Sequence, residues 1–195
     1  DAARGSVFVT GAGGMLGTAL METLPQDFDC TGFSSNQKPP VPNRGHWVQG
    51  NLLDFSSLTE TIRRLRPNVI VHAASSVSVN ECEKPENRDA IQKLHVGLTE
   101  VLVDVARELG TQIIYISTES VYDGTKSGLY IEGDQTNPLN NYARTKLAGE
   151  TPVLNYERGL VLRSNIIGWR TDGVLSFGEW VVDGIVRNEK RTMLS

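Results

Sequence analysis

The sequence predicts a three-layer α/β fold, in which helices cover both faces of a parallel sheet. Short apolar runs such as Asn68–Ser75 and Ile113–Ser117 are followed by segments whose apolar residues recur at helical spacing. Runs that are apolar on both faces are typical of strands buried between two helix layers. Strands that alternate with helices form parallel sheets joined by helical crossovers.

The first strand-to-helix connection is the most informative part of the chain. The β-branched run 7–9 leads into three glycines, Gly11, Gly14 and Gly17, with the spacing G-x-x-G-x-x-G, and a helical pattern follows until Pro25. Glycines let the backbone turn sharply and approach a ligand, and a helix N-terminus offers free N–H groups and a positive dipole. In this context the glycines predict the phosphate-binding turn of a Rossmann dinucleotide-binding fold. A flexible turn is the alternative.

The remaining elements follow from periodicity and from helix start and stop signals. We expect further strands at Cys30–Phe33, Trp47–Gln49 and Leu160–Arg163, and helices after Asp54, over Asp89–Leu109, over Tyr142–Glu150 and over Phe177–Ile185. The polar stretch Ser76–Arg88 is expected to be a loop, and His95 a hydrogen-bonded histidine of the core. Ligands bind at the carboxyl ends of parallel strands. We therefore expect the site at the glycine turn, Ala73–Ser75 and Ser117–Glu119.

The end of the second strand bears on the choice of cofactor. The segment Ser34-Ser35-Asn36 holds no acidic residue, and Lys38 and Arg44 follow it. A carboxylate at this point binds the adenosine ribose of NAD and would repel the 2′-phosphate of NADP. Its absence favours NADP(H), with NAD(H) as the alternative, and makes Ser34 and Ser35 candidate cofactor contacts.

Tyr142 and Lys146 are the candidate catalytic pair. They lie four residues apart on a predicted helix, so their side chains share one face. An ammonium group near a phenol lowers the pKa of the phenol from about 10 towards the range useful for proton transfer. A hydroxyl at the end of the preceding strand, from Thr118 or Ser117, would orient the substrate oxygen. The alternative is a solvated helix face.

Composition excludes several classes of protein. The 195 residues carry a formal net charge of −4, so nucleic acid and anionic membranes are not expected as partners. No apolar run approaches the roughly 18 residues of a membrane span, and the N-terminus lacks a signal-peptide pattern. Cys30 and Cys82 fit no metal or redox spacing. We expect a cytoplasmic protein with free thiols and no metal site.

Five segments together resemble a known family: Val9–Gly17, His72–Ala74, Ile116–Gly124, Asn137–Glu150 and Leu162–Ser164. The chain resembles the extended short-chain dehydrogenases/reductases, and within that class the dTDP-4-dehydrorhamnose reductase family. Three departures stand out. Glu119 replaces an aspartate, Ser120 replaces a tyrosine, and His95 replaces a helix asparagine.

The resemblance implies an NAD(P)H-dependent reductase that transfers hydride to the 4-keto carbon of a nucleotide-linked deoxysugar. Tyr142 would donate the proton, Lys146 would lower the pKa of Tyr142 and hold the nicotinamide ribose, and Thr118 would orient the carbonyl. Glu119 would border the substrate together with Thr118 and Tyr142. The remaining implied cofactor contacts are Gly11, Gly14, Met15, Leu16, Asn51, Leu52, Ala73, Ala74 and Ser75.

The same resemblance divides the chain and leaves alternatives open. Residues 1–168 would be the dinucleotide-binding Rossmann domain, and residues 169–195 the start of a small substrate-binding lobe that is largely absent, as expected for a fragment. A sugar-nucleotide epimerase or dehydratase of the same class is one alternative function. A non-catalytic NADP-binding regulatory subunit, like that of methionine adenosyltransferase, is another. A homodimer is also left open.

Overall fold

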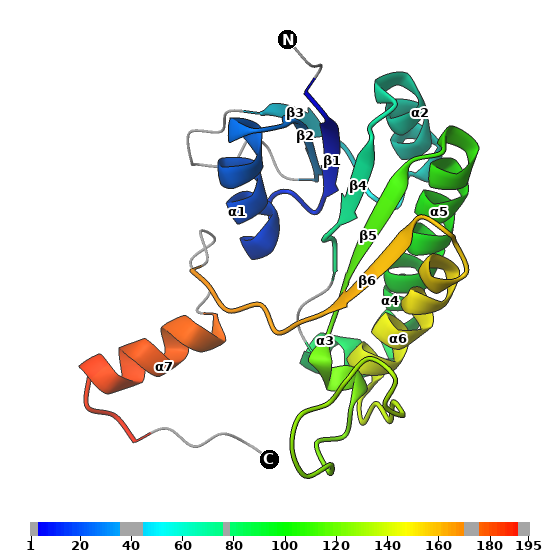
Figure 1. Ribbon diagram of the computed structural model, residues 1–195. Helices are drawn as coiled ribbons and strands as arrows, with labels where there is room; N and C mark the ends of the chain where they lie inside the picture. The colour runs from blue at the N-terminus through cyan, green and yellow to red at the C-terminus, as the bar shows by residue number, and fades with distance from the viewer. Residues whose placement is uncertain (1–3, 36–44, 76–78, 170–175, 191–195) are drawn as a thin grey trace.

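The computed structural model describes residues 4–35, 45–75, 79–169 and 176–190, and its centre is a six-stranded sheet (Figure 1). All neighbouring strands are parallel, in the order β3-β2-β1-β4-β5-β6. The strands are β1 (Ser6–Thr10), β2 (Asp29–Ser34), β3 (His46–Gln49), β4 (Val69–His72), β5 (Gln112–Ser117) and β6 (Gly159–Arg163). This is the strand order of the Rossmann fold, so the predicted fold class is confirmed.

The helices are α1 (Met15–Thr23), α2 (Phe55–Leu65), α3 (Val79–Glu83), α4 (Arg88–Gln92), α5 (Leu98–Leu109), α6 (Asn141–Leu154) and α7 (Phe177–Val186). In Figure 1, α1 lies on one face of the sheet, and α2, α4, α5 and α6 lie on the other. The helix α7, which follows β6 in the chain, lies apart from the sheet at the lower left of the view, below α1. Helix α2 begins where the sequence predicts, because the Asp54 side chain accepts a hydrogen bond from the Ser57 N–H.

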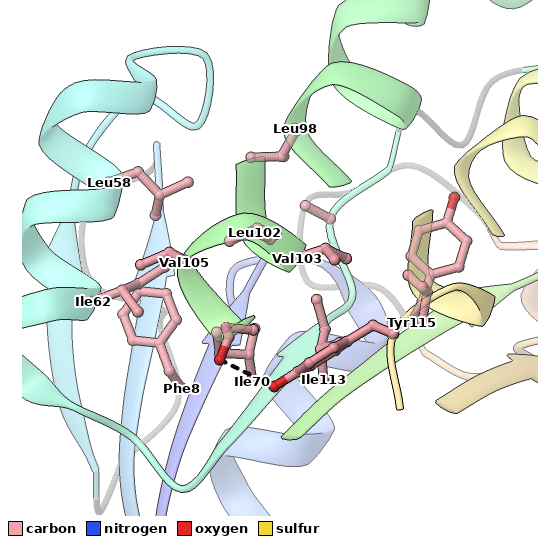
Figure 2. Packing of buried hydrophobic residues seen from close by; sticks show 14 of the residues in the cluster. Phe8, Leu58, Ile62, Ile70, Leu98, Leu102, Val103, Val105, Ile113 and Tyr115 are labelled. Carbon is pink, nitrogen blue, oxygen red and sulfur yellow. Dashed lines mark hydrogen bonds between the residues drawn. The ribbon is translucent and has the colours of Figure 1, made fainter. Parts of the chain in front are cut away.

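The core is two-sided, because successive residues of β1 point to opposite faces of the sheet. Phe8 belongs to the larger cluster, beneath α2 and α5, whereas Val7 and Val9 belong to the cluster beneath α1. Figure 2 shows the larger cluster, in which Leu58 and Ile62 of α2 and several α5 side chains gather around Phe8, Ile70 and Ile113. Each strand of the centre is thus covered on both faces, as its apolar sequence predicts.

The segment Ser76–Arg88 is not the loop that its polar composition suggests. Residues 76–78 lie outside the described part, but Val79–Glu83 forms α3, Pro85–Asn87 forms a 3₁₀ turn, and Arg88 begins α4. Cys82 of α3 is 3% exposed, and the Glu83 carboxylate accepts hydrogen bonds from the backbone and side chain of Asn141 at the start of α6. Tertiary contacts with α6 therefore select a helix that local composition does not predict.

The predicted helix Asp89–Leu109 exists but is not uniform. It begins one residue earlier, at Arg88, and between α4 and α5 it widens into a π-helical segment over Lys93–Gly97. It ends at Gly110, whose φ of +67° is left-handed. Segments of π-helix are often found at functional sites, and this one contains His95. None of the helices in the described ranges is long and apolar enough to cross a membrane.

Candidate active site

The predicted site residues follow the carboxyl ends of five strands, which meet along one edge of the sheet. The glycine turn follows β1, Ser34 ends β2, and Asn51 and Leu52 come just after β3. Ala73–Ser75 follows β4, and Thr118 follows β5. Because β3 lies at one edge of the sheet and β5 near the other, the site extends along almost the whole row of strands.

The glycine turn is tightly packed on its inner side. Gly11 has φ +68°, and a methyl group placed on it would lie 2.6 Å from Cα of Ala74. A methyl group on Gly17 would lie 2.2 Å from the carbonyl oxygen of Gly11. Contacts this short do not occur between real atoms, so both positions require glycine. They bring the start of α1 directly against the end of β4.

The outer side of the same turn is open. Gly14 is exposed, and a methyl group on it would approach within 4 Å only the carbonyl oxygen of Gly11, at 3.3 Å. Gly14 is the N-cap residue of α1, and as a glycine it has no side chain that could accept a hydrogen bond from the first turn of the helix. The first N–H groups of α1 therefore have no capping side chain at Gly14, and they are available to a ligand. This arrangement fits the pyrophosphate of a dinucleotide.

The residues after β2 and β3 differ in how accessible they are. Ser34 is buried and its carbonyl oxygen accepts a hydrogen bond from the Gly50 N–H, whereas Ser35 is exposed. The Asn51 side chain accepts a hydrogen bond from the Leu53 N–H, and Leu52 packs against the larger core cluster. Lys38 and Arg44 lie outside the described residues.

Tyr142, the predicted proton donor, lies near residues from several parts of the chain. It lies in the first turn of α6, which is capped by the Asn140 side chain. The side chains of Ser75, after β4, and Thr118, after β5, both act on the pKa of its phenol. The structure therefore brings together the predicted proton donor Tyr142, the predicted carbonyl-orienting Thr118, and Ser75, which was predicted only as a cofactor contact.

The two hydroxyls that end β5 have different environments. Ser117 donates a 2.5 Å hydrogen bond to Oε1 of Glu150, a carboxylate that is 1% exposed and paired with Arg163 at 2.6 Å. Thr118 instead donates to the carboxylate of the exposed Glu119 at 3.1 Å and acts on the pKa of the Tyr142 phenol. Of the two hydroxyls suggested by the sequence, Thr118 is the one placed at the phenol.

Lys146 lies one turn further along α6 and is almost completely buried, at 1% exposure. Its Nζ donates to the carbonyl oxygen of Ile116 at 2.7 Å and lies 4.0 Å from the centroid of the Tyr115 ring. Burial lowers the pKa of this ammonium to about 7, although the Glu150 carboxylate favours the charged form. Lys146 is therefore close to losing its proton at neutral pH.

The lowering of the Tyr142 pKa by Lys146 stays a prediction, since Lys146 is not among the groups that act on this phenol here. Burial raises the pKa of the Tyr142 phenol above its usual value, and negative charge at Glu119 and Cys82 acts in the same direction. The Ser75 and Thr118 side chains act in the opposite direction, but burial is the largest cause. The phenol is thus held in its protonated form, while the Lys146 ammonium is directed at Ile116.

His95 is part of the site to an extent that the sequence did not indicate. It is 1% exposed, and its ring meets the Tyr142 ring edge-on with 5.8 Å between centroids. Its Nε2 lies 3.0 Å from Oγ of Ser75, and its Nδ1 lies 2.7 Å from Oγ1 of Thr145. The prediction of a buried, hydrogen-bonded histidine is confirmed. The additional contact with Tyr142 depends on packing between α6 and the π-helical segment.

The fold and the glycine turn define a protein of the Rossmann class. Comparison with known families is more specific. The family model described as the RmlD substrate binding domain matches residues 5–172, which is most of the chain. The chain belongs to this family.

Individual relatives carry different names. The chain is 36% identical over 163 residues to methionine adenosyltransferase 2 subunit beta of Rattus norvegicus, covering 83% of this chain and 46% of that protein. It is 36% identical over 146 residues to dTDP-4-dehydrorhamnose reductase of Salmonella typhimurium, covering 72% and 43%. Among solved structures, UDP-glucose 4-epimerase from Brucella ovis in complex with NAD is 32% identical, with a TM-score of 0.70 and coverage of 82% and 51%. The chain spans about half the length of these relatives.

Proposed function

We propose that the protein is an NAD(P)H-dependent oxidoreductase that reduces a 4-keto nucleotide-linked deoxysugar, as dTDP-4-dehydrorhamnose reductase does. The observation that carries this proposal is the placement of Tyr142. Burial raises the pKa of this phenol, and the hydroxyl side chains that act on it, Ser75 and Thr118, follow β4 and β5 on the same edge of the sheet as the open glycine turn. This is where a Rossmann fold receives a dinucleotide and its substrate.

The residues around the glycine turn would hold the cofactor. Gly11, Gly14, Met15 and Leu16 would bind the pyrophosphate through backbone N–H groups. Ala73, Ala74 and Ser75 would border its middle, and Asn51 and Leu52 its adenine. Ser34 and Ser35 would face the adenosine ribose, where the lack of a carboxylate in 34–35 favours NADP(H) over NAD(H). Bound there, a nicotinamide dinucleotide supplies the hydride.

The side chains that follow β5 and those on α6 would supply the proton and align the substrate with the cofactor. Tyr142 would protonate the oxygen of the reduced carbonyl, for which a phenol held in its protonated form is suited. Thr118 would orient that oxygen, and the exposed Glu119 would border the sugar. Lys146 would hold the nicotinamide ribose and the alignment of α6 against β5, where its Nζ already bonds Ile116.

The test is a turnover assay on the full-length protein. NADPH and NADH are titrated by calorimetry, and nucleotide-linked 4-keto deoxysugars are then offered while NADPH absorbance is followed. The proposal expects NADPH to bind more tightly than NADH and to be consumed in a 1:1 ratio to product. Binding without consumption, across the panel of sugars, would contradict the reductase assignment.

A second candidate is a non-catalytic NADP-binding regulatory subunit. The specific observation in its favour is the 36% identity to methionine adenosyltransferase 2 subunit beta over 83% of this chain. The presence of Thr118, Tyr142 and Lys146 in the order expected for a reductase favours the enzyme. Co-purification with a larger enzyme, together with no reduction of any keto sugar, would favour the subunit.

A third candidate is a sugar-nucleotide epimerase or dehydratase, favoured by the 32% identity to the Brucella ovis epimerase. Such enzymes return the hydride to the sugar, so the same assay distinguishes them. Product would form without net consumption of NADPH. A cytoplasmic location, a homodimer and a domain boundary at residues 168–169 stay predictions of the sequence.

A further inference from the structure

A polar loop lies in the chain between the two predicted substrate contacts Thr118 and Tyr142. It covers residues 122–137, after the turn that contains Glu119 and before α6, whose second residue is Tyr142. We call it the connecting loop, and in Figure 1 it forms the loops at the bottom of the view, below α3 and α6. A loop that begins beside Glu119 and ends beside Tyr142 is placed to border a substrate held there.

The connecting loop has a defined shape, although most of its residues are exposed. The Asp123 carboxylate accepts hydrogen bonds from the hydroxyls of Thr125 and Tyr130, at 2.8 and 2.9 Å. It also accepts from the side-chain amide of Asn137 at 2.9 Å. The backbone N–H of Asn137 donates to the carbonyl oxygen of Val121 at 2.9 Å. These bonds organise the interior of the loop and close its base.

Arg163, the last residue of β6, joins the connecting loop to the core. Its Nη1 donates to the Tyr122 hydroxyl at 2.7 Å and to the carbonyl oxygen of Glu132 at 3.3 Å. The Tyr122 hydroxyl in turn donates to the carbonyl oxygen of Ile131 at 3.0 Å. The Tyr122 ring stacks on Tyr130, with 4.4 Å between centroids. One guanidinium nitrogen therefore contacts both the first residue of the loop and its second half.

The opposite side of the same guanidinium is fixed in the interior. Nη2 and Nε of Arg163 donate to the two carboxylate oxygens of Glu150 on α6, at 2.6 and 3.0 Å. Glu150 is 1% exposed and also accepts from Ser117 of β5 at 2.5 Å. A planar guanidinium bound at two points to a buried carboxylate has little freedom to turn, so the direction of Nη1 is set. Because α6 also carries Tyr142, the loop is held relative to the predicted proton donor.

We propose that Arg163 is a positioning residue that holds the connecting loop as a fixed rim of the substrate site. It acts through the Tyr122 hydroxyl. Tyr142 has separate support, because the first turn of α6 is hydrogen-bonded to Glu83 of α3. Loss of the bond to Tyr122 should therefore weaken sugar binding and leave proton transfer by Tyr142 unchanged. This consequence rests on the proposed function, whereas the anchoring of the loop does not.

The first experiment measures the anchoring in Tyr122→Phe, which removes only the hydroxyl. Amide hydrogen exchange is followed by NMR on the full-length protein without cofactor or substrate. The N–H groups of Ile131 and Asp134 report on the loop, because each is hydrogen-bonded to the other residue. Their exchange should become about tenfold faster, since a hydrogen bond to a charged group is lost. Unchanged exchange would overturn the proposal.

Arg163→Lys tests whether the hydroxyl acts through Arg163. An ammonium can pair with Glu150 but lacks the planar fork that spans Glu150 and Tyr122, so exchange in the loop should accelerate to a similar extent. Combined with Tyr122→Phe, it should have no further effect on the loop. Additive increases would contradict the role of the bond between Arg163 and Tyr122. If Arg163→Lys does not fold, Tyr122→Phe alone still decides whether the hydroxyl anchors the loop.

The matched control is Arg63→Lys. Arg63 also binds both oxygens of a carboxylate, that of Glu108, at 2.8 and 3.0 Å, but this pair is about half exposed and joins α2 to α5. The control should leave exchange in the connecting loop unchanged. Equal acceleration in Arg63→Lys would mean that a general loss of stability is the cause, and it would overturn the proposal.

The second experiment is kinetic and uses the nucleotide-linked 4-keto sugar that the turnover assay identifies. Tyr122→Phe should raise KM for the sugar about three- to tenfold, keep kcat within about twofold and leave NADPH affinity unchanged. An equal fall in kcat and kcat/KM would contradict a rim that only holds the sugar. If no sugar is reduced, the proposed function fails, and hydrogen exchange still decides the anchoring.

Discussion

The two halves of the site are built by different means. The glycine turn between β1 and α1 would bind the proposed cofactor through its backbone, and its shape depends on the absence of a side chain at Gly11 and Gly17. The half around Tyr142 consists of side chains from several segments, among them the buried His95 imidazole, which is hydrogen-bonded to the hydroxyls of Ser75 and Thr145. The glycine turn depends on the absence of side chains at close contacts, whereas the half around Tyr142 depends on the protonation of its side chains. Substitutions should therefore damage them in different ways.

The largest effect is expected from Tyr142→Phe. Loss of the proton donor should lower turnover by roughly a thousandfold, within the range found for general acid catalysts, and leave NADPH affinity within a few-fold. Steady-state kinetics and calorimetry measure the two quantities. Tyr156→Phe is the control: its hydroxyl bonds Ala106 and Thr111 in the core, so it should lose stability and keep turnover. Equal losses of turnover in both variants would remove Tyr142 from its role.

Gly11→Val should show that the first half depends on space. The substitution combines a left-handed φ of +68° with a clash 2.6 Å from Cα of Ala74, and should cost about 3 kcal/mol or more of stability in urea unfolding. Gly124→Val tests the backbone strain alone, because Gly124 has φ +74° and no atom within 4 Å of an added methyl group. It should cost about 1 kcal/mol. Equal costs would mean that the contact with Ala74 does not matter.

The buried charge of Lys146 should appear as a pH dependence of stability. Its pKa is about 7 in the folded protein, below the ordinary value for lysine, so the unfolded chain binds more protons between pH 7 and about 10. The free energy of unfolding should therefore rise with pH in this window, by up to about 1.4 kcal/mol per pH unit. Lys146→Met should remove this slope. Urea titrations of both proteins at several pH values make the comparison, and parallel curves would contradict the lowered pKa.

The smallest effect is expected from Ser35→Asp, at the exposed end of β2. A carboxylate there would repel the 2′-phosphate of NADPH and shift the ratio of NADPH to NADH affinity towards NADH by about tenfold. Ser56→Asp, on the exposed first turn of α2, adds the same charge elsewhere and should leave the ratio unchanged. If both variants shift the ratio equally, the end of β2 does not select the cofactor.

The glycine turn could be predicted from the sequence, whereas the arrangement of side chains around Tyr142 could be predicted only in part. Strand, glycine turn and helix are encoded within the 18 residues Ser6–Thr23, and the structure has them where the pattern places them. The spacing of Tyr142 and Lys146 likewise places both on α6. The pKa directions were not predictable, because burial outweighs the charge of a neighbour and depends on how α6 packs on β5.

The contacts of His95 were beyond sequence reasoning for a related reason. Ser75, His95 and Thr145 are separated by 20 and 50 residues, and only the packing of the π-helical segment against α6 brings them together. The helix α3 was missed for the same reason, since Cys82 and Glu83 stabilise it through contacts with α6. Local composition carries no information about a partner that distant.

The contact between Gly11 and Ala74 has a consequence for how such a protein can change over generations. With an added methyl group only 2.6 Å from Cα of Ala74, the turn has no spare room on the side that precedes Ser75. Any mutation that enlarges the turn would push the end of β4 and displace Ser75, which follows it. In the proposed reductase, a new nucleotide preference could therefore evolve at the open rim near Gly14 and Ser35, whereas the inner wall at Gly11 and Ala74 would have to be inherited unchanged.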